Sequence, residues 1–246
     1  MATHRLSTEW PRLAWRVLIV ALILPTAVTW LYFVALHGTH AALQQSAYAL
    51  LKGCQFALPV FAIWMWAGAD MWRVKFRGVG VGRGVVFGLL VVLLLMGVYE
   101  WLIRDTAVGD RLQQSILEKL HSMGLATPVK FILVGVFYAV IHSGLEEYYW
   151  RWFAFRWARL LMRPGLAVGL SSLGFMLHHV LLLGFFLGFG QWQTWLFSAA
   201  IAVGGACWAW LYHRTNNILA IWISHALVDA GIFALGFAMV RNQLIT

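Results

Sequence analysis

Charged residues and cysteines are scarce in this sequence, and both scarcities limit what kind of protein it can be. Only 11% of its 246 residues are charged, whereas 62% are hydrophobic and 15 are Trp. This composition excludes an ordinary water-soluble enzyme and is typical of a polytopic integral membrane protein. The only two cysteines, Cys54 and Cys207, lie inside apolar runs that place them near opposite ends of the membrane, so we predict no disulfide between them.

Several sequence signatures of known chemistry are also missing. The zincin motif H-E-x-x-H does not occur. The glycines between residues 78 and 84 lack the G-x-G-x-x-G spacing and follow no predicted strand, so we expect a flexible turn there and no phosphate cradle. No internal repeat or linker divides the chain, which predicts one integral membrane domain over residues 1–246 and weighs against a proton-coupled transporter with repeated halves.

Basic residues outnumber acidic ones by 18 to 9, which gives a formal net charge of +9. Such an excess could indicate a nucleic-acid partner. Here, however, the basic residues occur in short clusters between apolar runs, and this pattern marks membrane topology. We therefore expect a lipid bilayer as partner and no nucleic acid.

Apolar runs of about 18–24 residues, each long enough to cross the hydrocarbon core of a bilayer, recur along the chain. They predict an all-α transmembrane helical bundle of about seven spans, with six to eight compatible with the sequence. The runs lie near residues 14–36, 50–72, 84–103, 128–150, 166–189, 193–212 and 217–239. Between the third and fourth runs, the polar stretch from residue 105 to residue 127 has the spacing of an amphipathic helix, which we expect on the outer membrane surface.

The distribution of Lys and Arg predicts how the chain is oriented. With a cytoplasmic N-terminus, twelve basic residues fall on the inner side: Arg5, Arg12, Arg16, Arg73, Lys75, Arg77, Arg83, Arg151, Arg156, Arg159, Arg163 and Arg214. Six fall on the outer side: Lys52, Arg104, Arg111, Lys119, Lys130 and Arg241. This excess predicts a cytoplasmic N-terminus. The compact chain with Arg-rich loops suggests a bacterial inner membrane.

Three predicted spans carry ionisable side chains among apolar neighbours. They are His142, Glu146 and Glu147 on the fourth span, His178 and His179 on the fifth, and His225 and Asp229 on the seventh. An ionisable group at bilayer depth costs at least about 2.5–3.5 kcal/mol, so such groups need a partner or a water-filled cavity. We therefore expect these side chains to converge, although any single His or Asp could equally be a packing residue.

Glu146 is the carboxylate that local pairing leaves free. On a helix, Glu147 and Arg151 are four residues apart and share a face, so they are expected to form a structural ion pair, whereas Glu146 is turned away by about 100°. Helical sequence continues from Pro128 to about Met162. Either this helix projects into the cytoplasm, or its membrane section is shifted so that Glu146 lies nearer the bilayer centre.

Only the second alternative brings Glu146 level with His179 and His225. A buried carboxylate can take a proton from water and later return it, while an imidazole orients the water or binds a metal. We expect His142 to be a satisfied polar residue rather than a ligand. His178 precedes His179 and is expected to point elsewhere, with an indirect role at most.

Three short motifs resemble the CPBP family, the CAAX proteases and bacteriocin-processing enzymes also called Abi. The family pattern is E-E-x-x-x-R, then F-x-x-x-H, then H-x-x-x-[ND], on successive spans. It is matched by Glu146, Glu147 and Arg151, by Phe175 and His179, and by His225 and Asp229. The resemblance covers about residues 129–236, which we predict to be the catalytic core.

This resemblance implies an intramembrane endopeptidase that hydrolyses a peptide bond in a membrane-associated protein or peptide. It implies Glu146 as general base, assisted by His179, with His225 and Asp229 stabilising the oxyanion or completing a site. Glu147, Arg151 and Phe175 are expected to support them. The family is described both as a metalloprotease, here with Zn²⁺ on Glu146, His179 and His225, and as using a metal-free glutamate mechanism. A non-catalytic binding or immunity protein with the same fold is the alternative.

Overall fold

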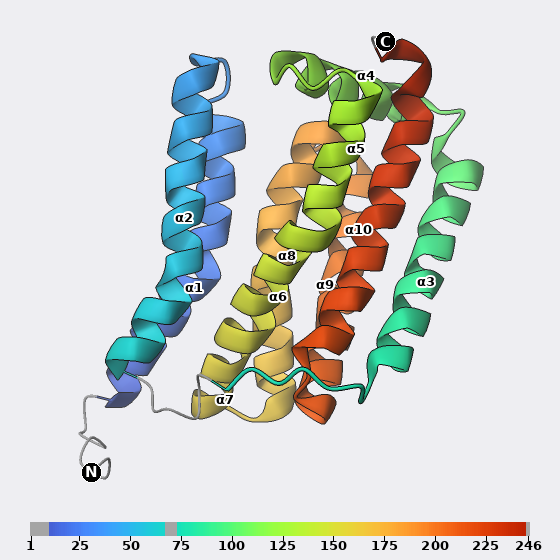
Figure 1. The fold of residues 1–246 in the computed structure, drawn as a ribbon. Helices are drawn as coiled ribbons and strands as arrows, with labels where there is room; N and C mark the ends of the chain where they lie inside the picture. The colour runs from blue at the N-terminus through green and yellow to red at the C-terminus, as the bar shows by residue number, and fades with distance from the viewer. Residues whose placement is uncertain (1–9, 67–72, 245–246) are drawn as a thin grey trace.

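The computed structural model describes residues 10–66 and 73–244, which form helices connected by short loops (Figure 1), with no strand among them. The elements are α1 (Trp10–Trp30), η1 (Leu31–Ala35), α2 (Ala41–Trp66), α3 (Val81–Val98), η3 (Tyr99–Ile103), α4 (Ala107–Ser122), α5 (Pro128–Val136), η4 (Phe137–His142), α6 (Ser143–Glu147), η5 (Tyr148–Phe155), α7 (Arg156–Leu161), α8 (Pro164–Leu187), α9 (Trp192–Thr215), α10 (Ile218–Val240) and η6 (Arg241–Gln243). Seven helical stretches are long and apolar enough to cross a membrane. The predicted all-α bundle with seven spans is therefore confirmed.

Two span boundaries differ from those that the sequence predicts. The second span begins at Ala42 rather than near residue 50, because the polar residues at its start are accommodated within the helix. One of them, Gln44, donates a hydrogen bond of 2.7 Å to the carbonyl of Tyr32. The predicted end of this span, residues 67–72, lies outside the described residues. The fourth span extends to Leu161, well beyond the predicted end at residue 150.

The helices are arranged around the second half of the fourth span. Figure 1 shows α1 and α2 as a pair at one side, α8 and α9 behind, and α10 between α5 and α3. The largest fully buried side chains include Trp150, Phe153 and Trp157, and the core cluster around them also contains Leu18 from α1 and Phe175 from α8. The aromatic side chains of η5 and α7 therefore belong to the main buried core of the bundle.

The predicted amphipathic helix is α4, which lies across the end of the bundle at which the chain ends (Figure 1). Its N-cap Thr106 accepts a hydrogen bond of 3.3 Å from the amide of Gly109. Its buried residue Leu120 packs in a second cluster with Phe131 and Val240. The helix thus closes one end of the bundle instead of adding a span.

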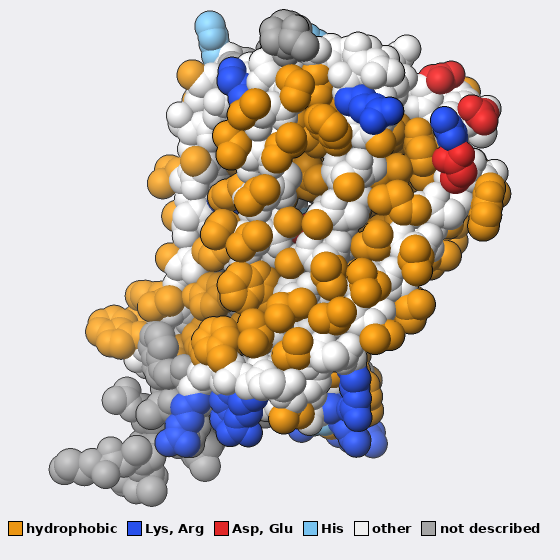
Figure 2. Space-filling view, turned by 45° about the vertical axis from the view of Figure 1, so that its right-hand side comes forward, with side chains coloured by type: hydrophobic (Ala, Val, Ile, Leu, Met, Phe, Trp, Pro, Cys, Tyr) orange, Lys and Arg blue, Asp and Glu red, His pale blue; other side chains and the backbone are white. Residues whose placement is uncertain are grey.

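The surface has the distribution of side chains that a membrane requires. Figure 2 shows hydrophobic side chains over the middle of one face, while Lys and Arg gather at its two ends. Large apolar side chains such as Leu90, Leu93 and Leu133 are more than half exposed. Contiguous apolar exposure on this scale marks a surface that water does not cover. This surface supports the assignment as an integral membrane protein.

Glycines allow α3 and α10 to pack with their backbones in contact. A Cβ atom at Gly88 would lie 2.8 Å from the carbonyl oxygen of Ser224, and one at Gly84 would collide with the carbonyl of Ala220. Small residues four apart are the usual means by which membrane helices approach closely. The expectation of a flexible turn over residues 78–84 is therefore wrong in part, since α3 begins at Val81 and Gly84 is a packing residue.

Asn217 connects the start of α10 to the loop before α3. Its side-chain oxygen accepts from the amides of Leu219 and Arg77, at 3.2 and 3.1 Å, and its side-chain amide donates to the carbonyls of Arg77 and Val79, at 2.6 and 2.7 Å. The residue is fully buried. The same side chain therefore caps α10 and fixes the loop.

We expect Asn217→Ala to lower the free energy of unfolding by about 2 kcal/mol, because it removes an N-cap and leaves buried carbonyls without donors. The measurement is the apparent midpoint of thermal unfolding in detergent. Asn242→Ala, at an exposed position of η6, is the matched control and should change nothing. Equal midpoints for Asn217→Ala and wild type would contradict this role.

Candidate active site

Glu146 lies in α6, a short part of the continuous helical span Pro128–Leu161. π-helical turns flank α6 on both sides, as η4 and η5. Such turns often occur at functional sites, because each one changes the direction in which the following side chains point. Most side chains from Ser143 to Ala158 are buried inside the protein. Glu146 therefore lies inside the bundle.

Three histidines from three elements surround the carboxylate of Glu146. His178 of α8 has its Nε2 atom 3.3 Å from Oε1, and His142 of η4 has its Nε2 atom 3.9 Å from the same oxygen. His225 of α10 approaches the other oxygen, Oε2, with an Nε2 distance of 3.7 Å. The glutamate itself is only 4% exposed. Elements far apart in the sequence thus meet at one buried carboxylate.

The neighbouring carboxylate, Glu147, is neutralised within the protein. Its Oε1 atom accepts hydrogen bonds from the Arg151 guanidinium at 2.9 Å and from Nδ1 of His225 at 2.8 Å. Arg151 also donates to the carbonyl of Gly205 at 3.2 Å, and its guanidinium lies 4.5 Å from the ring centre of Phe175. The predicted pairing of Glu147 with Arg151 is therefore present, and it leaves Glu146 as the carboxylate without a cation of its own.

His225 connects the two glutamates. Because its Nδ1–H donates to the carboxylate of Glu147, its Nε2 atom faces Glu146 and lies 3.6 Å from Oδ1 of Asp229. The indole of Trp208 stacks on the imidazole at 4.3 Å and 20°. Trp208 is itself fixed by a hydrogen bond of 3.0 Å from its Nε1–H to Oγ of Ser224. The ring of His225 is thus fixed by a polar contact at one edge and by an aromatic contact on its face.

These residues lie within a segment that resembles known proteins. Residues 128–231 match the family of type II CAAX prenyl endopeptidase Rce1-like proteins. The three motifs that indicated the CPBP family all fall inside this Rce1-like segment, so that recognition is confirmed. At family level, the match supports an endopeptidase of the CAAX type. No curated protein and no solved structure matches the chain.

The position of His178 relative to Glu146 differs from the one that the sequence predicts. Helical spacing predicts that His178 points away from the site, yet His178 contacts Glu146 directly and stacks on Trp150, with ring planes only 3° apart. His179 has no ion pair within 4.0 Å of a described carboxylate, and its Nδ1–H donates to the carbonyl of Phe175 at 2.9 Å. The two imidazole rings are 4.1 Å apart, so both border the same space.

The Rce1-like segment contains one group of side chains that could hold a metal ion, among the residues that the structure describes. Glu146, His178 and His179 each offer a ligand atom, and these atoms lie within 4.8 Å of one another. Since Nδ1 of His179 donates to a carbonyl, its Nε2 atom keeps the lone pair that ligation requires. One carboxylate and two imidazoles form a donor set used by catalytic zinc sites. His178 thus takes the place that the family resemblance gives to His225.

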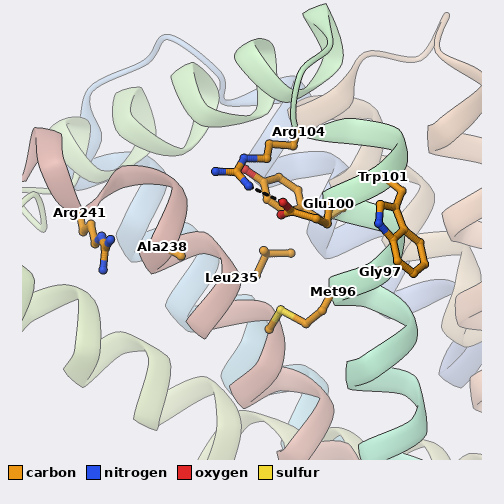
Figure 3. A pocket seen from close by; sticks show the side chains of 9 residues that line it. Met96, Gly97, Glu100, Trp101, Arg104, Leu235, Ala238 and Arg241 are labelled. Atoms are coloured by element: carbon orange, nitrogen blue, oxygen red, sulfur yellow. Dashed lines mark hydrogen bonds and ion pairs between the residues drawn. The ribbon is translucent and has the colours of Figure 1, made fainter.

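Two surface grooves lie elsewhere. The larger, with a volume of about 540 Å³, lies between α3 and α10 near the end of the bundle that α4 covers (Figure 3). Its lining includes the ion pair of Arg104 with Glu100 and the side chains of Trp101 and Arg241, but no residue of the Glu146 cluster. A second groove of about 240 Å³ beside Phe131 also excludes that cluster. The Glu146 cluster is therefore separate from both.

Proposed function

We propose that this protein is an intramembrane endopeptidase that hydrolyses a peptide bond of a membrane-associated peptide or protein with water activated by Glu146. The observation that carries the proposal is the unequal environment of the two adjacent glutamates. Glu147 is paired with the guanidinium of Arg151, whereas Glu146 faces three imidazoles and forms no ion pair with a Lys or Arg among the described residues. A buried carboxylate in these surroundings is suited to accept a proton and later to release it.

In the proposed reaction, the carboxylate of Glu146 takes one proton from water as the water oxygen attacks the carbonyl carbon of the scissile bond. The Nε2–H of His178 donates to this carboxylate and holds it in place. When the tetrahedral intermediate collapses, the C–N bond breaks and Glu146 passes its proton to the leaving nitrogen. One product then carries a new carboxyl group and the other a new amine.

His225 is proposed to stabilise the oxyanion of the intermediate. Its Nδ1–H is already donated to Glu147, so a second donor at Nε2 requires the imidazolium form. Three carboxylates favour that form, since Glu146, Glu147 and Asp229 all lie within 4.0 Å of the ring nitrogens. A positive donor aimed at developing negative charge is the arrangement that lowers such barriers.

Both the metal-dependent and the metal-free alternatives are compatible with this set of residues. Glu146, His178 and His179 would hold Zn²⁺, and such an ion supplies Lewis-acid polarisation of a carbonyl oxygen or of water.

The protein is proposed to lie in a bacterial inner membrane with its N-terminus in the cytoplasm. The basis is the excess of Lys and Arg on the side of the membrane where the N-terminus lies. The whole chain is proposed to be a single domain.

The test uses the purified protein in detergent with a library of quenched peptides in H₂¹⁸O. We expect cleavage, with one ¹⁸O atom from the attacking water in the new carboxyl group of the product. A parallel sample with a chelator, together with the metal content of the protein, separates the zinc form from the metal-free form. Absence of cleavage, together with a cellular phenotype that survives replacement of Glu146, would instead support the non-catalytic binding protein.

A further inference from the structure

The larger of the two surface grooves combines apolar with charged side chains, and the proposed reaction uses none of them. It lies between the ends of α3 and α10 and has a volume of about 540 Å³ (Figure 3). Its lining consists of Met96, Gly97, Tyr99, Glu100, Trp101, Arg104, Leu235, Ala238 and Arg241. A groove of this size and composition is large enough to bind part of a ligand, and its lining indicates which kind.

The charged and the apolar side chains of the groove are separated along the helices. On α10, Leu235 precedes Arg241 by six residues, which is about 9 Å along the axis. On α3 and η3, Met96 precedes Arg104 by about two helical turns. Both arginines therefore lie toward the end of the bundle that α4 covers, and the apolar side chains lie toward its middle (Figure 3). An amphiphilic molecule parallel to the helices has the same separation of polar and apolar parts.

The position of the groove indicates that membrane lipids surround it. Leu93 and Leu94 of α3, which precede it in the chain, are 68% and 66% exposed, as expected of side chains that face acyl chains. Trp101 of η3 is 84% exposed and lies beside the groove (Figure 3). Trp and Arg side chains at the end of an apolar span are typical of the headgroup region. The charged end of the groove is therefore expected at the depth of the phosphates.

The charges that line the groove leave one cation without a partner. Arg104 forms an ion pair with Glu100, and both side chains are exposed. Arg241 is also exposed, and none of the ion pairs between described residues includes it. Two arginines and one glutamate thus give the groove one uncompensated positive charge. A phosphodiester carries one negative charge, and guanidinium groups are well suited to bind its oxygens.

We propose that this groove binds one anionic phospholipid, with its phosphate held by Arg104 and Arg241 and an acyl chain against Met96 and Leu235. The site is independent of the proposed peptidase reaction and takes a different class of ligand. A lipid bound there contacts both α3 and α10, so its binding should stabilise the folded protein.

The experiment measures lipid binding to the delipidated full-length protein in neutral detergent by native mass spectrometry, with the midpoint of thermal unfolding as a second readout. The probes are dioleoyl phosphatidylglycerol and dioleoyl phosphatidylethanolamine at equal concentrations. Wild type should bind one phosphatidylglycerol in preference to phosphatidylethanolamine and unfold at a higher temperature with it. Arg241→Gln should weaken this binding by about 10-fold, the lower end of the range for a hydrogen bond to a charged group.

Two further variants separate the groove from the rest of the surface. Lys130→Gln removes an exposed cation at the same end of the bundle, one that donates to the carbonyl of Gly124 and does not line the groove. It is the matched control and should bind phosphatidylglycerol as wild type does. Ala238→Trp, at an exposed position of the lining, fills the groove without changing its charge and should abolish the specific binding.

Four results would overturn the inference, and none of them depends on peptide cleavage. Equal affinity of wild type for the two lipids would show that the headgroup charge is not recognised. Unchanged binding of phosphatidylglycerol by Arg241→Gln would exclude this arginine as its partner, and unchanged binding by Ala238→Trp would place the lipid outside the groove. If inorganic phosphate raised the unfolding midpoint as much as phosphatidylglycerol does, the ligand would be free phosphate rather than a lipid.

Discussion

Replacing Glu146 by Gln is expected to reduce the rate of peptide cleavage by a factor of about 10² to 10⁴, the contribution typical of a positioned general base. The amide has nearly the same size as the carboxylate and can still accept the hydrogen bond from His178, so packing should be preserved. It cannot, however, take a proton from water. The measurement is kcat for a cleavable peptide, together with the apparent midpoint of thermal unfolding.

Glu100→Gln is the matched control for this substitution. Glu100 is an exposed glutamate that pairs with Arg104 at the far end of the bundle and lies outside the Glu146 cluster. We expect it to keep the wild-type rate. If Glu146→Gln cleaved peptides as fast as wild type, Glu146 could not be the base, and the chemistry would have to be assigned to other groups of the cluster.

Replacing Arg151 by Met is expected to have the largest effect on stability. Arg151 and Glu147 are 2% and 0% exposed, so removing the guanidinium leaves a buried carboxylate whose remaining polar contact is the hydrogen bond from His225. Breaking such a buried pair costs about 3–5 kcal/mol, which corresponds to a fall in the unfolding midpoint on the order of 10 °C. The midpoint in detergent, followed by scattering and by intrinsic Trp fluorescence, measures this effect.

Two further variants show whether charge is the cause. The double variant Glu147→Gln with Arg151→Met removes both partners and should recover a large part of the lost stability. Arg104→Met breaks an exposed pair with Glu100 and should leave the midpoint unchanged. If the double variant were no more stable than Arg151→Met alone, the loss would come from packing against Phe175 rather than from the unpaired charge.

The sequence predicts the architecture well, because the forces that decide it act on long segments. An apolar run that can cross a bilayer is visible without any knowledge of its neighbours. The start of the second span is predicted less well. Gln44 resembles a residue of a loop, yet it donates a hydrogen bond to the carbonyl of Tyr32 in η1. This contact is tertiary, so no local pattern reports it.

The convergence of charged groups also follows from the sequence, since isolated ionisable side chains in a membrane are too costly. The identity of the histidine that contacts Glu146 does not follow from the sequence. Regular helical spacing separates His178 and His179 by about 100°, but the long side chain of Glu146 reaches the edge of α8 that His178 occupies. The π-helical turns on both sides of α6 change the register further, and sequence periodicity gives no sign of them.

Because of the glycine contact between α3 and α10, the geometry of the site also depends on α3, a helix that contributes no side chain to the Glu146 cluster. A side chain at Gly88 would press on the carbonyl of Ser224, the residue directly before His225 and the partner of Trp208. The atom closest to the added side chain is a backbone oxygen, which cannot rotate aside as the end of a flexible side chain can. Selection for activity should therefore act on Gly84 and Gly88 as strictly as on residues that contact Glu146, and a mutational scan limited to the surroundings of the glutamate would miss them.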